Sequence, residues 1–186
     1  MEHEIPELGR RILVWGAMGA GKSTVACHVA TALELPVIDL STVRYDSSCR
    51  HLAAHEMAPK LRKSLEMYTL GWVFDGSDSK IDHVTLPRAD TVIWLHLPLR
   101  VSFWRLLKRT ARYRWESDLL RGWARMSWEV FTRRSYFGGA LRTHVRHART
   151  IRRQLEELAD SVRVYELRTA REVETFLHEI EATVKR

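Results

Sequence analysis

The residues with the clearest chemical potential form a glycine-rich stretch near the start of the chain. Eight of them, Gly16-Ala17-Met18-Gly19-Ala20-Gly21-Lys22-Ser23, fit the spacing Gly-x-x-x-x-Gly-Lys-Ser. A loop of this kind holds phosphates when it leaves a buried strand and opens a helix, because its backbone N–H groups then converge at the positive end of the helix dipole. Glycine allows close approach of the backbone, Lys22 can reach the terminal phosphates and the Ser23 hydroxyl can bind Mg²⁺. We expect these eight residues and Thr24 to bind the phosphates of a nucleotide.

Apolar runs and amphipathic stretches alternate along the chain and indicate the elements that must position this loop. Residues 11–15 lack helical periodicity and predict a buried strand before the loop, whereas residues 22–34 have helical spacing and predict a helix after it. Further strands are expected at 35–40, 71–76, 91–97 and 161–167, and helices at 51–68, 100–114, 123–159 and 171–184, with candidate breaks at Pro59 and Gly138-Gly139. This alternation predicts an α/β fold with a parallel sheet covered on both faces.

Several segments outside the loop support a family resemblance. They are Val37-Ile38-Asp39, Trp72-Val73-Phe74-Asp75-Gly76, Leu86-Pro87-Arg88-Ala89-Asp90 and Trp104-Arg105-Leu106-Leu107-Lys108-Arg109. With the loop, they resemble the adenylate-kinase-like P-loop proteins often labelled DNA topology modulation proteins, from about Arg10 onward. The resemblance implies ATP and Mg²⁺ as cofactors and the three-layer nucleoside-monophosphate-kinase fold, with a five-stranded parallel sheet and a basic helical lid at about 112–150. The length of 186 residues fits one domain spanning 1–186.

The resemblance assigns roles to two acids at the ends of expected strands. Asp75 precedes a glycine where the family's acid helps to hold Mg²⁺ through water, so Ser23 and Asp75 are the candidate metal ligands; a cap on the following turn is the alternative for Asp75. Asp39 is the candidate base that accepts the proton of an acceptor hydroxyl. The family's acid usually falls about two residues later, where this chain has Ser41. Asp46 on the same loop, helix capping and simple surface exposure are therefore alternatives.

Arginines after the fourth expected strand are the other catalytic candidates. Arg105 and Arg109 are four residues apart on an expected helix and share one face. The resembled kinases use such a pair, with the loop lysine, here Lys22, to neutralise charge on the transferring phosphoryl group; a solvated basic face is the alternative. Weaker candidates are Arg112 and Arg114 in the same stripe, Lys80 and Arg88 for an acceptor phosphate, and Arg168 and Thr169 where this fold usually meets adenine through the backbone.

Charge is unevenly distributed along the chain. Residues 100–153 contain fifteen Lys or Arg against three acids, a local excess of +12, so that the net charge of +7 leaves −5 for the remainder. A basic segment of this size points to a polyanion, either nucleic acid or the phosphates of a nucleotide. A lid over a nucleotide accounts for part of it, and the surplus beyond Arg114 keeps nucleic acid as the less favoured partner.

The remaining residue types carry structural expectations. Trp15, Trp72 and Trp94 lie in expected strands and belong to the core, and Cys27 is expected to be a buried small residue. Trp104, Trp115, Trp123 and Trp128 are interleaved with arginines, a mixture that can stack nucleic-acid bases, but the helical spacing of Trp104, Leu107 and Ala111 favours a buried face. His144 and His147 have no acid or cysteine nearby, which argues against zinc.

Composition sets the cellular expectations. No run approaches the roughly eighteen apolar residues that a membrane span needs, and the start Met1-Glu2-His3-Glu4 lacks the basic and then apolar order of a signal peptide. Two cysteines are too few for a disulfide scaffold. We therefore expect a cytoplasmic protein without a membrane partner.

Taken together, these patterns predict an ATP-dependent, Mg²⁺-dependent kinase that acts on a small acceptor, either a nucleotide or a hydroxyl-bearing metabolite. One alternative is a P-loop ATPase or nucleotide sensor that binds nucleic acid through residues 100–153. Another is a nucleotide-binding regulatory protein without catalysis.

Overall fold

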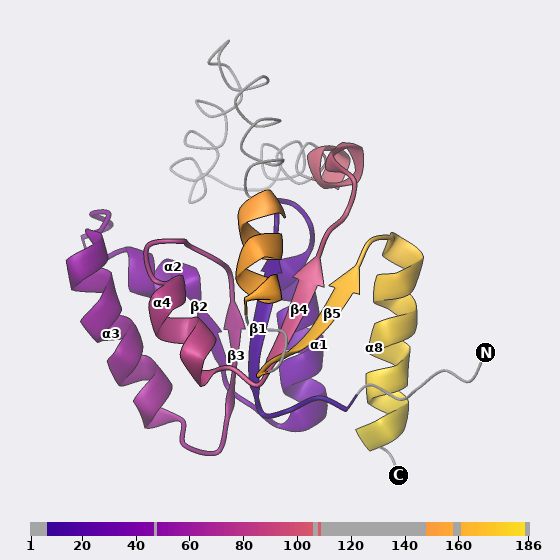
Figure 1. Ribbon diagram of the computed structural model, residues 1–186, viewed down its shortest axis with the longest axis horizontal. Coiled ribbons are helices and arrows are strands. Elements are labelled where there is room, and N and C mark those ends of the chain that lie inside the picture. Colours follow the sequence, from indigo (N-terminus) through magenta and orange to yellow (C-terminus); the bar gives the residue numbers. More distant parts are fainter. Residues whose placement is uncertain (1–6, 47, 106–107, 109–147, 158–160, 185–186) are drawn as a thin grey trace.

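A five-stranded parallel sheet forms the centre of the molecule, as the sequence predicts (Figure 1). The computed structural model describes residues 7–46, 48–105, 108, 148–157 and 161–184. The strands are β1 (Arg11–Gly16), β2 (Val37–Asp39), β3 (Trp72–Asp75), β4 (Thr91–Leu95) and β5 (Arg163–Leu167), in the order β2-β3-β1-β4-β5. Every neighbouring pair is parallel, so all carboxyl ends of the strands lie at one edge.

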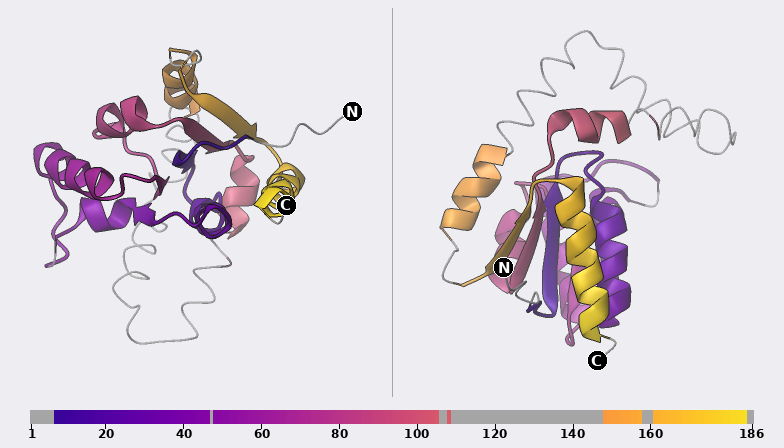
Figure 2. Two further views of the ribbon diagram at one scale, coloured as in Figure 1. Left: turned by 90° about the horizontal axis from the view of Figure 1, so that it is seen from below. Right: turned by 90° about the vertical axis from the view of Figure 1, so that its right-hand side faces the viewer.

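Helices cover both faces of the sheet. On one face, α1 (Lys22–Leu33) and α8 (Ala170–Val184) lie side by side (Figure 2). On the other lie α2 (Leu40–Arg44), α3 (Ala54–Met67), α4 (Asp82–Thr85), the short 3₁₀ helix η1 (Leu86–Arg88) and a helix over 148–156. A further helix over 99–105 follows β4 above the carboxyl edge. The three layers confirm the expected α/β architecture.

The central strand shows why both faces must be covered. Ile12 and Val14 of β1 pack with α1 and α8, whereas Leu13 and Trp15 pack on the opposite side with α3 and residues 148–156. This alternation follows from the period of two in a strand, and a strand buried on both faces is a continuous apolar run. Trp15, Trp72 and Trp94 are at most 3% exposed, which confirms their expected core positions.

Two expectations of burial are wrong. Cys27 is exposed because the inner face of α1 is made by Val25, Ala26, Val29 and Ala30, and position 27 points away from it. Trp104 is 56% exposed, since the helix over 99–105 turns Ser102 toward the protein instead. Leu107, Ala111, Trp115, Trp123, Trp128, His144 and His147 lie outside the described residues, as do Gly138 and Gly139.

Element boundaries differ from the expectations mainly after β2. That strand ends at Asp39, and the chain turns directly into α2, because the Asp39 carboxylate accepts the backbone N–H of Ser41 at 2.7 Å and caps the helix. Helix α3 starts at Ala54, three residues later than expected, and continues across Pro59 without a break. The sequence did not predict α2, α4 or η1, which span only three to five residues each. Within the described part of the chain, no helix has the length and apolar character needed to cross a membrane.

Candidate functional site

The glycine-rich loop lies at the carboxyl edge of the sheet, between β1 and α1. Gly16, Gly19 and Gly21 have φ angles of 152°, 80° and 98°, which favour glycine over residues with a Cβ atom. A Cβ atom on Gly16 would also lie 2.9 Å from the carbonyl oxygen of Leu95. Helix α1 starts at Lys22 with no acid in its first turn and no side-chain cap. The loop therefore presents the positive end of α1 in the geometry that binds anions.

The Lys22 ammonium is folded onto this loop. Its Nζ donates hydrogen bonds to the carbonyl oxygens of Gly16 at 2.9 Å and Ala17 at 3.0 Å. These contacts hold the positive charge within the turn. A phosphate entering the loop would meet the ammonium together with the first N–H groups of α1.

Ser23 and Asp75, which the sequence predicts as metal ligands, lie together. The Ser23 hydroxyl hydrogen-bonds to the Asp75 carboxylate, which is only 7% exposed. Burial raises the pKa of Asp75, while the bond from Ser23 and the charge of Lys22 act in the opposite direction. No group of three or more His, Cys, Asp or Glu that could hold a metal occurs among the residues placed by the structure. A hydroxyl and a carboxylate fit Mg²⁺, which keeps several waters and binds through few protein ligands and substrate phosphates.

Asp39 lies beside Asp75 at the end of the next strand, where the register pairs the two residues. Its side chain is exposed, its Oδ1 caps α2, and its charge contributes to the raised pKa of Asp75. The position at the carboxyl edge is the one expected for a base, and the capping bond is the structural alternative that the sequence left open. Asp39 combines both features.

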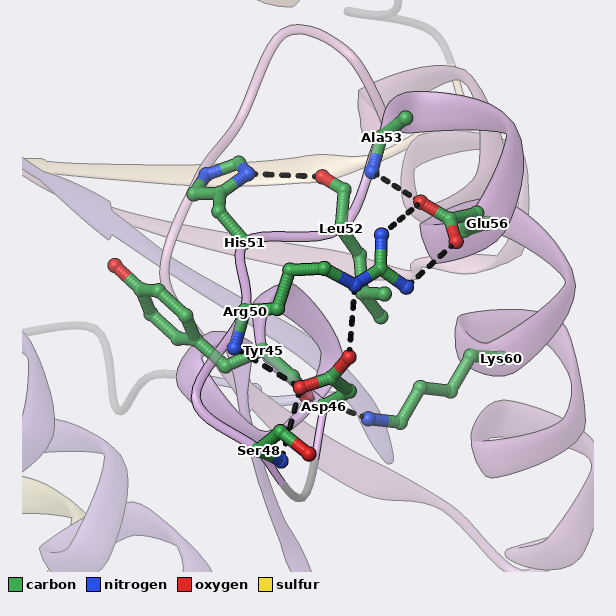
Figure 3. Close-up of polar contacts among 9 residues, drawn as sticks. All are labelled: Tyr45, Asp46, Ser48, Arg50, His51, Leu52, Ala53, Glu56 and Lys60. Carbon is green, nitrogen blue, oxygen red and sulfur yellow. Dashed lines mark hydrogen bonds and ion pairs between the residues drawn. The ribbon is translucent and has the colours of Figure 1, made fainter.

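Asp46, the other candidate base, lies in a network of hydrogen bonds within its own loop (Figure 3). Its carboxylate accepts the backbone N–H groups of Ser48 and Arg50, both at 2.9 Å, and the Arg50 Nε at 3.0 Å. Arg50 also donates to Glu56 at 3.0 Å through Nη2. The backbone bond from Arg50 is the main cause of a lowered pKa of Asp46. The carboxylate is thus occupied with holding the loop over 45–53 against α3, and sequence reasoning missed both Arg50 and Glu56.

Arg105 reaches the phosphate loop from the helix that follows β4. Its Nη1 donates to the carbonyl oxygen of Ala20 at 3.0 Å, and a Cβ atom on Gly21 would lie 3.3 Å from the same nitrogen. The structure thereby places the guanidinium on the phosphate loop, and Arg105 and Lys22 line the same cavity although they are far apart in the sequence. Its expected companion Arg109 lies outside the described residues, together with Arg112, Arg114 and most of the expected lid.

A cavity of about 460 Å³ opens beside Lys22 and Arg105. One side consists of the loop and the start of α1, from Met18 to Val25, with Arg105. We call the other side the α8 wall; it consists of Ala170, Val173, Glu174 and Leu177. The cavity therefore has cations and helix N–H groups on one side and a mostly apolar surface on the other, which suits a ligand with an anionic end and an apolar ring.

The other sequence candidates do not line this cavity. The Arg168 guanidinium donates to Glu166 at 2.8 Å, and its backbone N–H donates to Glu172 at 2.8 Å. Thr169 caps α8 by accepting the N–H of Glu172 at 3.1 Å. Arg88 donates to the carbonyl oxygen of Val84 at 2.9 Å, and Lys80 is exposed. The α8 wall, which no motif indicated, provides the lining instead.

A second polar cluster, also missed by sequence reasoning, lies at the ends of β4 and β5. Glu166 contacts His96 at 2.6 Å, Arg168 at 2.8 Å and Arg152 at 3.4 Å. The His96 ring stacks on Trp94 with a centroid distance of 4.4 Å. The bonds from Arg168 and then His96 lower the pKa of Glu166 to about 2. This cluster joins β4, β5 and the helix over 148–156.

Polar groups, among them the buried Asp82, also link α2 and α4 to the helix over 148–156. The Arg44 Nη2 contacts Asp78 at 2.8 Å, and the backbone N–H of Asp78 donates to Asp82 at 3.2 Å. Asp82 is 4% exposed and also hydrogen-bonds with the Gln154 side chain. Burial is the main cause that raises the pKa of Asp82 to about 6.

Comparisons with known proteins agree with this architecture. The chain is similar to a sugar kinase from Janibacter sp. HTCC2649 in its unliganded structure, with a TM-score of 0.52 and 16% identity over 94% of this chain and 91% of that one. It is also similar to a gluconokinase from Sinorhizobium meliloti 1021, with a TM-score of 0.50 and 19% identity over 95% of this chain and 91% of that one. No family model and no curated protein matches the sequence. The chain thus has the fold of the P-loop kinases.

Proposed function

We propose that the protein is a Mg²⁺-dependent kinase that transfers the γ-phosphoryl group of ATP to a hydroxyl group of a small acceptor. The carrying observation is the convergence of Lys22, Arg105 and the Ser23–Asp75 pair on one glycine-rich loop at the start of α1. Phosphoryl transfer depends on positioned cations and a metal ion more than on covalent chemistry of the protein. The loop and its neighbours supply these requirements in one place, and the kinase fold supports the same reaction class.

Each of these residues has a distinct task in this proposal. Lys22 exchanges the carbonyl oxygens of Gly16 and Ala17 for phosphate oxygens when a nucleotide binds. Arg105, 3.0 Å from the loop carbonyl of Ala20, adds positive charge that stabilises the negative charge of the transferring phosphoryl group. Arg109 and the lid at about 112–150 extend that positive charge. Ser23 and Asp75 would hold Mg²⁺, and the ion would supply positive charge that offsets part of the negative charge of the phosphates.

Asp39 serves as the base that accepts the proton of the acceptor hydroxyl. Only its Oδ1 takes the bond from Ser41, so Oδ2 is available toward the carboxyl edge. The two carboxylates, Asp39 and Asp75, end adjacent strands at this edge. Their negative charge favours a neutral hydroxyl-bearing metabolite over a nucleoside monophosphate. Arg88, a candidate for binding an acceptor phosphate, supports this choice because its guanidinium is directed to the Val84 carbonyl.

The experiment combines binding and turnover on the full chain. ATP with Mg²⁺ should raise the melting temperature, because any ligand that binds the folded state stabilises it. A panel of sugars, sugar acids, nucleosides and nucleoside monophosphates should then give ADP with at least one neutral acceptor. Lys22→Ala should remove both responses while keeping the unliganded melting temperature. If wild-type protein and Lys22→Ala respond to ATP equally, the phosphate-loop assignment is wrong; if ATP binds but no acceptor yields ADP, the kinase proposal fails.

A further inference from the structure

Arg44 lies on the acceptor side of the candidate site, by which we mean the carboxyl ends of β2 and β3, where Asp39 and Asp75 lie. Helix α2 begins directly after Asp39 and ends at Arg44, so the candidate base and this cation stand at its two ends. The chain after Asp75 packs against the same helix, because a Cβ atom on Gly76 would lie 2.8 Å from the Cβ atom of Leu40. Arg44 is thus a cation near the place where the proposed function locates the acceptor hydroxyl.

The positive charge of Arg44 is neutralised by Asp78, which follows Asp75 by three residues. The Arg44 Nη2 donates to the Asp78 Oδ2 at 2.8 Å, and the two side chains are 31% and 14% exposed. Asp78 is held in place for this contact, because its Oδ1 accepts the backbone N–H of Lys80 at 3.1 Å and its own N–H donates to Asp82 at 3.2 Å. A partly buried pair of this kind is screened less by salt than a fully exposed one.

The guanidinium of Arg44 keeps hydrogen-bonding capacity that Asp78 does not use. Its Nε is buried and has no hydrogen-bond partner, whereas Nη2 makes the contact with Asp78. A guanidinium has five N–H donors and binds carboxylates and phosphates through two parallel hydrogen bonds. Asp78 therefore opposes a second anion at Arg44 by its charge, and not by occupying every donor of the side chain.

We infer that Asp78 excludes acceptors that carry an anionic group, by holding the charge of Arg44 neutralised on the acceptor side. This inference rests on the proposed function, which places the acceptor beside Asp39. An anionic group would have to displace Asp78 from Arg44 or lie next to its carboxylate, and either event costs free energy. A neutral polyhydroxy acceptor avoids both costs, because its hydroxyls can donate to the carboxylate and accept from the guanidinium.

The test compares a neutral sugar with the sugar acid of the same carbon skeleton, beginning with D-glucose and D-gluconate and D-ribose and D-ribonate. The full-length variants are Asp78→Asn, which removes the charge but keeps an oxygen for the N–H of Lys80, and Asp78→Asn combined with Arg44→Gln. Glu157→Gln is the matched control, because it breaks an ion pair with Arg153 on the helix over 148–156.

Two quantities are measured for each protein. The first is kcat/KM for each sugar and each acid, from the formation of ADP. The second is the rise in melting temperature that each acid causes in the presence of ADP and Mg²⁺, which needs no turnover. Melting temperatures without ligand verify folding, and Asp78→Ser replaces Asp78→Asn if that variant does not fold.

Wild type and Glu157→Gln should favour the sugar over its acid. Asp78→Asn should lower the ratio of the two kcat/KM values about tenfold, because hydrogen bonds between a freed guanidinium and a carboxylate are charge-assisted. The acid should then raise the melting temperature of Asp78→Asn more than that of wild type. Adding Arg44→Gln should restore the preference for the sugar and remove the extra stabilisation, a reversal that simple damage to the fold would not produce.

An unchanged ratio in Asp78→Asn overturns the inference, and so does a wild-type preference for the acid. A shift toward the acid that persists after Arg44→Gln also overturns it, because the anion would then bind elsewhere. Failure of the kinase proposal has a different signature. If no acceptor yields ADP although ATP binding depends on Lys22, the kinase proposal fails, and the melting temperatures alone decide whether Asp78 keeps anions from Arg44.

Discussion

Asp39 and Asp75 end neighbouring strands, yet their surroundings suit them to different work. Asp75 is buried beside Ser23 and Lys22, and its pKa is raised chiefly because burial disfavours its charged form. Asp39 is exposed and caps α2 with one oxygen. A bound metal ion would stabilise the charged form of Asp75, which burial disfavours. A base that exchanges protons with an acceptor must be accessible, as Asp39 is.

This difference predicts separate effects on Mg²⁺ binding. Asp75→Asn should weaken the apparent Mg²⁺ affinity about 10- to 100-fold, whereas Asp39→Asn should lower kcat and change the Mg²⁺ affinity far less, through the charge that it removes beside Asp75. In the wild type, protons compete with Mg²⁺ for Asp75, so Mg²⁺ affinity should fall as pH decreases, beginning at a higher pH than for an ordinary aspartate. Magnesium titrations of the ADP-bound protein across the acidic and neutral range measure this. Identical pH profiles for wild type and Asp75→Asn would contradict the metal assignment.

The sequence predicted the residues of the phosphate loop because their function depends on a local spacing. It placed Ser23 and Asp75 at the same edge because parallel strands share their carboxyl ends. Glu166 and its partners were not predictable in this way. His96 and Glu166 are 70 positions apart, and an acid or base in isolation carries no sign of its tertiary partner. Cys27 shows the opposite error, since its residue type predicts burial although α1 turns that position outward.

At the scale of elements, Glu166 anchors the helix over 148–156 to the sheet. Its carboxylate contacts Arg152 of that helix, His96 after β4 and Arg168 after β5. Arg152 also lies 5.8 Å from the centre of the Trp94 ring. One side chain thus connects three segments of the chain.

Glu166→Gln should therefore destabilise the protein at neutral pH. The folded state lowers the pKa of Glu166 from 4.5 to about 2, so its contribution is complete above pH 5 and is lost as pH falls toward 2. Because Arg152 and Arg168 are partly exposed, we expect a loss of about 1 to 2 kcal/mol. Chemical unfolding at several pH values measures this difference, which should shrink toward acid. Glu157→Gln, which breaks an exposed pair with Arg153, is the control with little effect; equal losses in both variants would rule out a special role for Glu166.

Elements were predictable where their patterns were long. The five strands appear as apolar runs or alternations, and α1 and α8 have helical spacing over at least twelve residues. Helices α2, α4 and η1 are too short for a period to be read. In particular, Leu40 continues the apolar run of β2, and only the bond from Ser41 to Asp39 shows that the strand has ended. The hydrogen bond that caps α2 sets the end of β2 at Asp39, whereas the apolar run predicts a longer strand.

At the scale of the whole molecule, the basic segment over 100–153 serves at least two internal purposes. Arg105 contacts the phosphate loop and Arg152 contacts Glu166. Nine of its fifteen cations, including Arg109, lie outside the described residues. Of the described cations of this segment, Arg105 is thus directed to the phosphate loop and Arg152 to a contact between elements.

We expect only weak, salt-sensitive binding to DNA, without a specific complex. Anisotropy of a short labelled duplex should show no saturable binding at about 150 mM salt, where contacts to phosphates are strongly weakened. The same protein should still bind ADP, because its phosphate loop is a formed anion site. Tight binding at that salt concentration, with a slope of log K against log salt of about −0.9 for each neutralised phosphate, would favour the nucleic-acid alternative.

The exposure of both cysteines has a practical consequence. Cys27 and Cys49 are the two cysteines of the chain, and both are exposed. Cys27 lies on α1, one turn beyond the phosphate loop, and Cys49 lies in the loop that Asp46 and Arg50 hold against α3. Two thiol-reactive dyes attached to these cysteines would therefore report the distance between α1, which follows the phosphate loop, and the loop before α3. Titrating candidate acceptors against that signal offers a way to find the one that moves this loop.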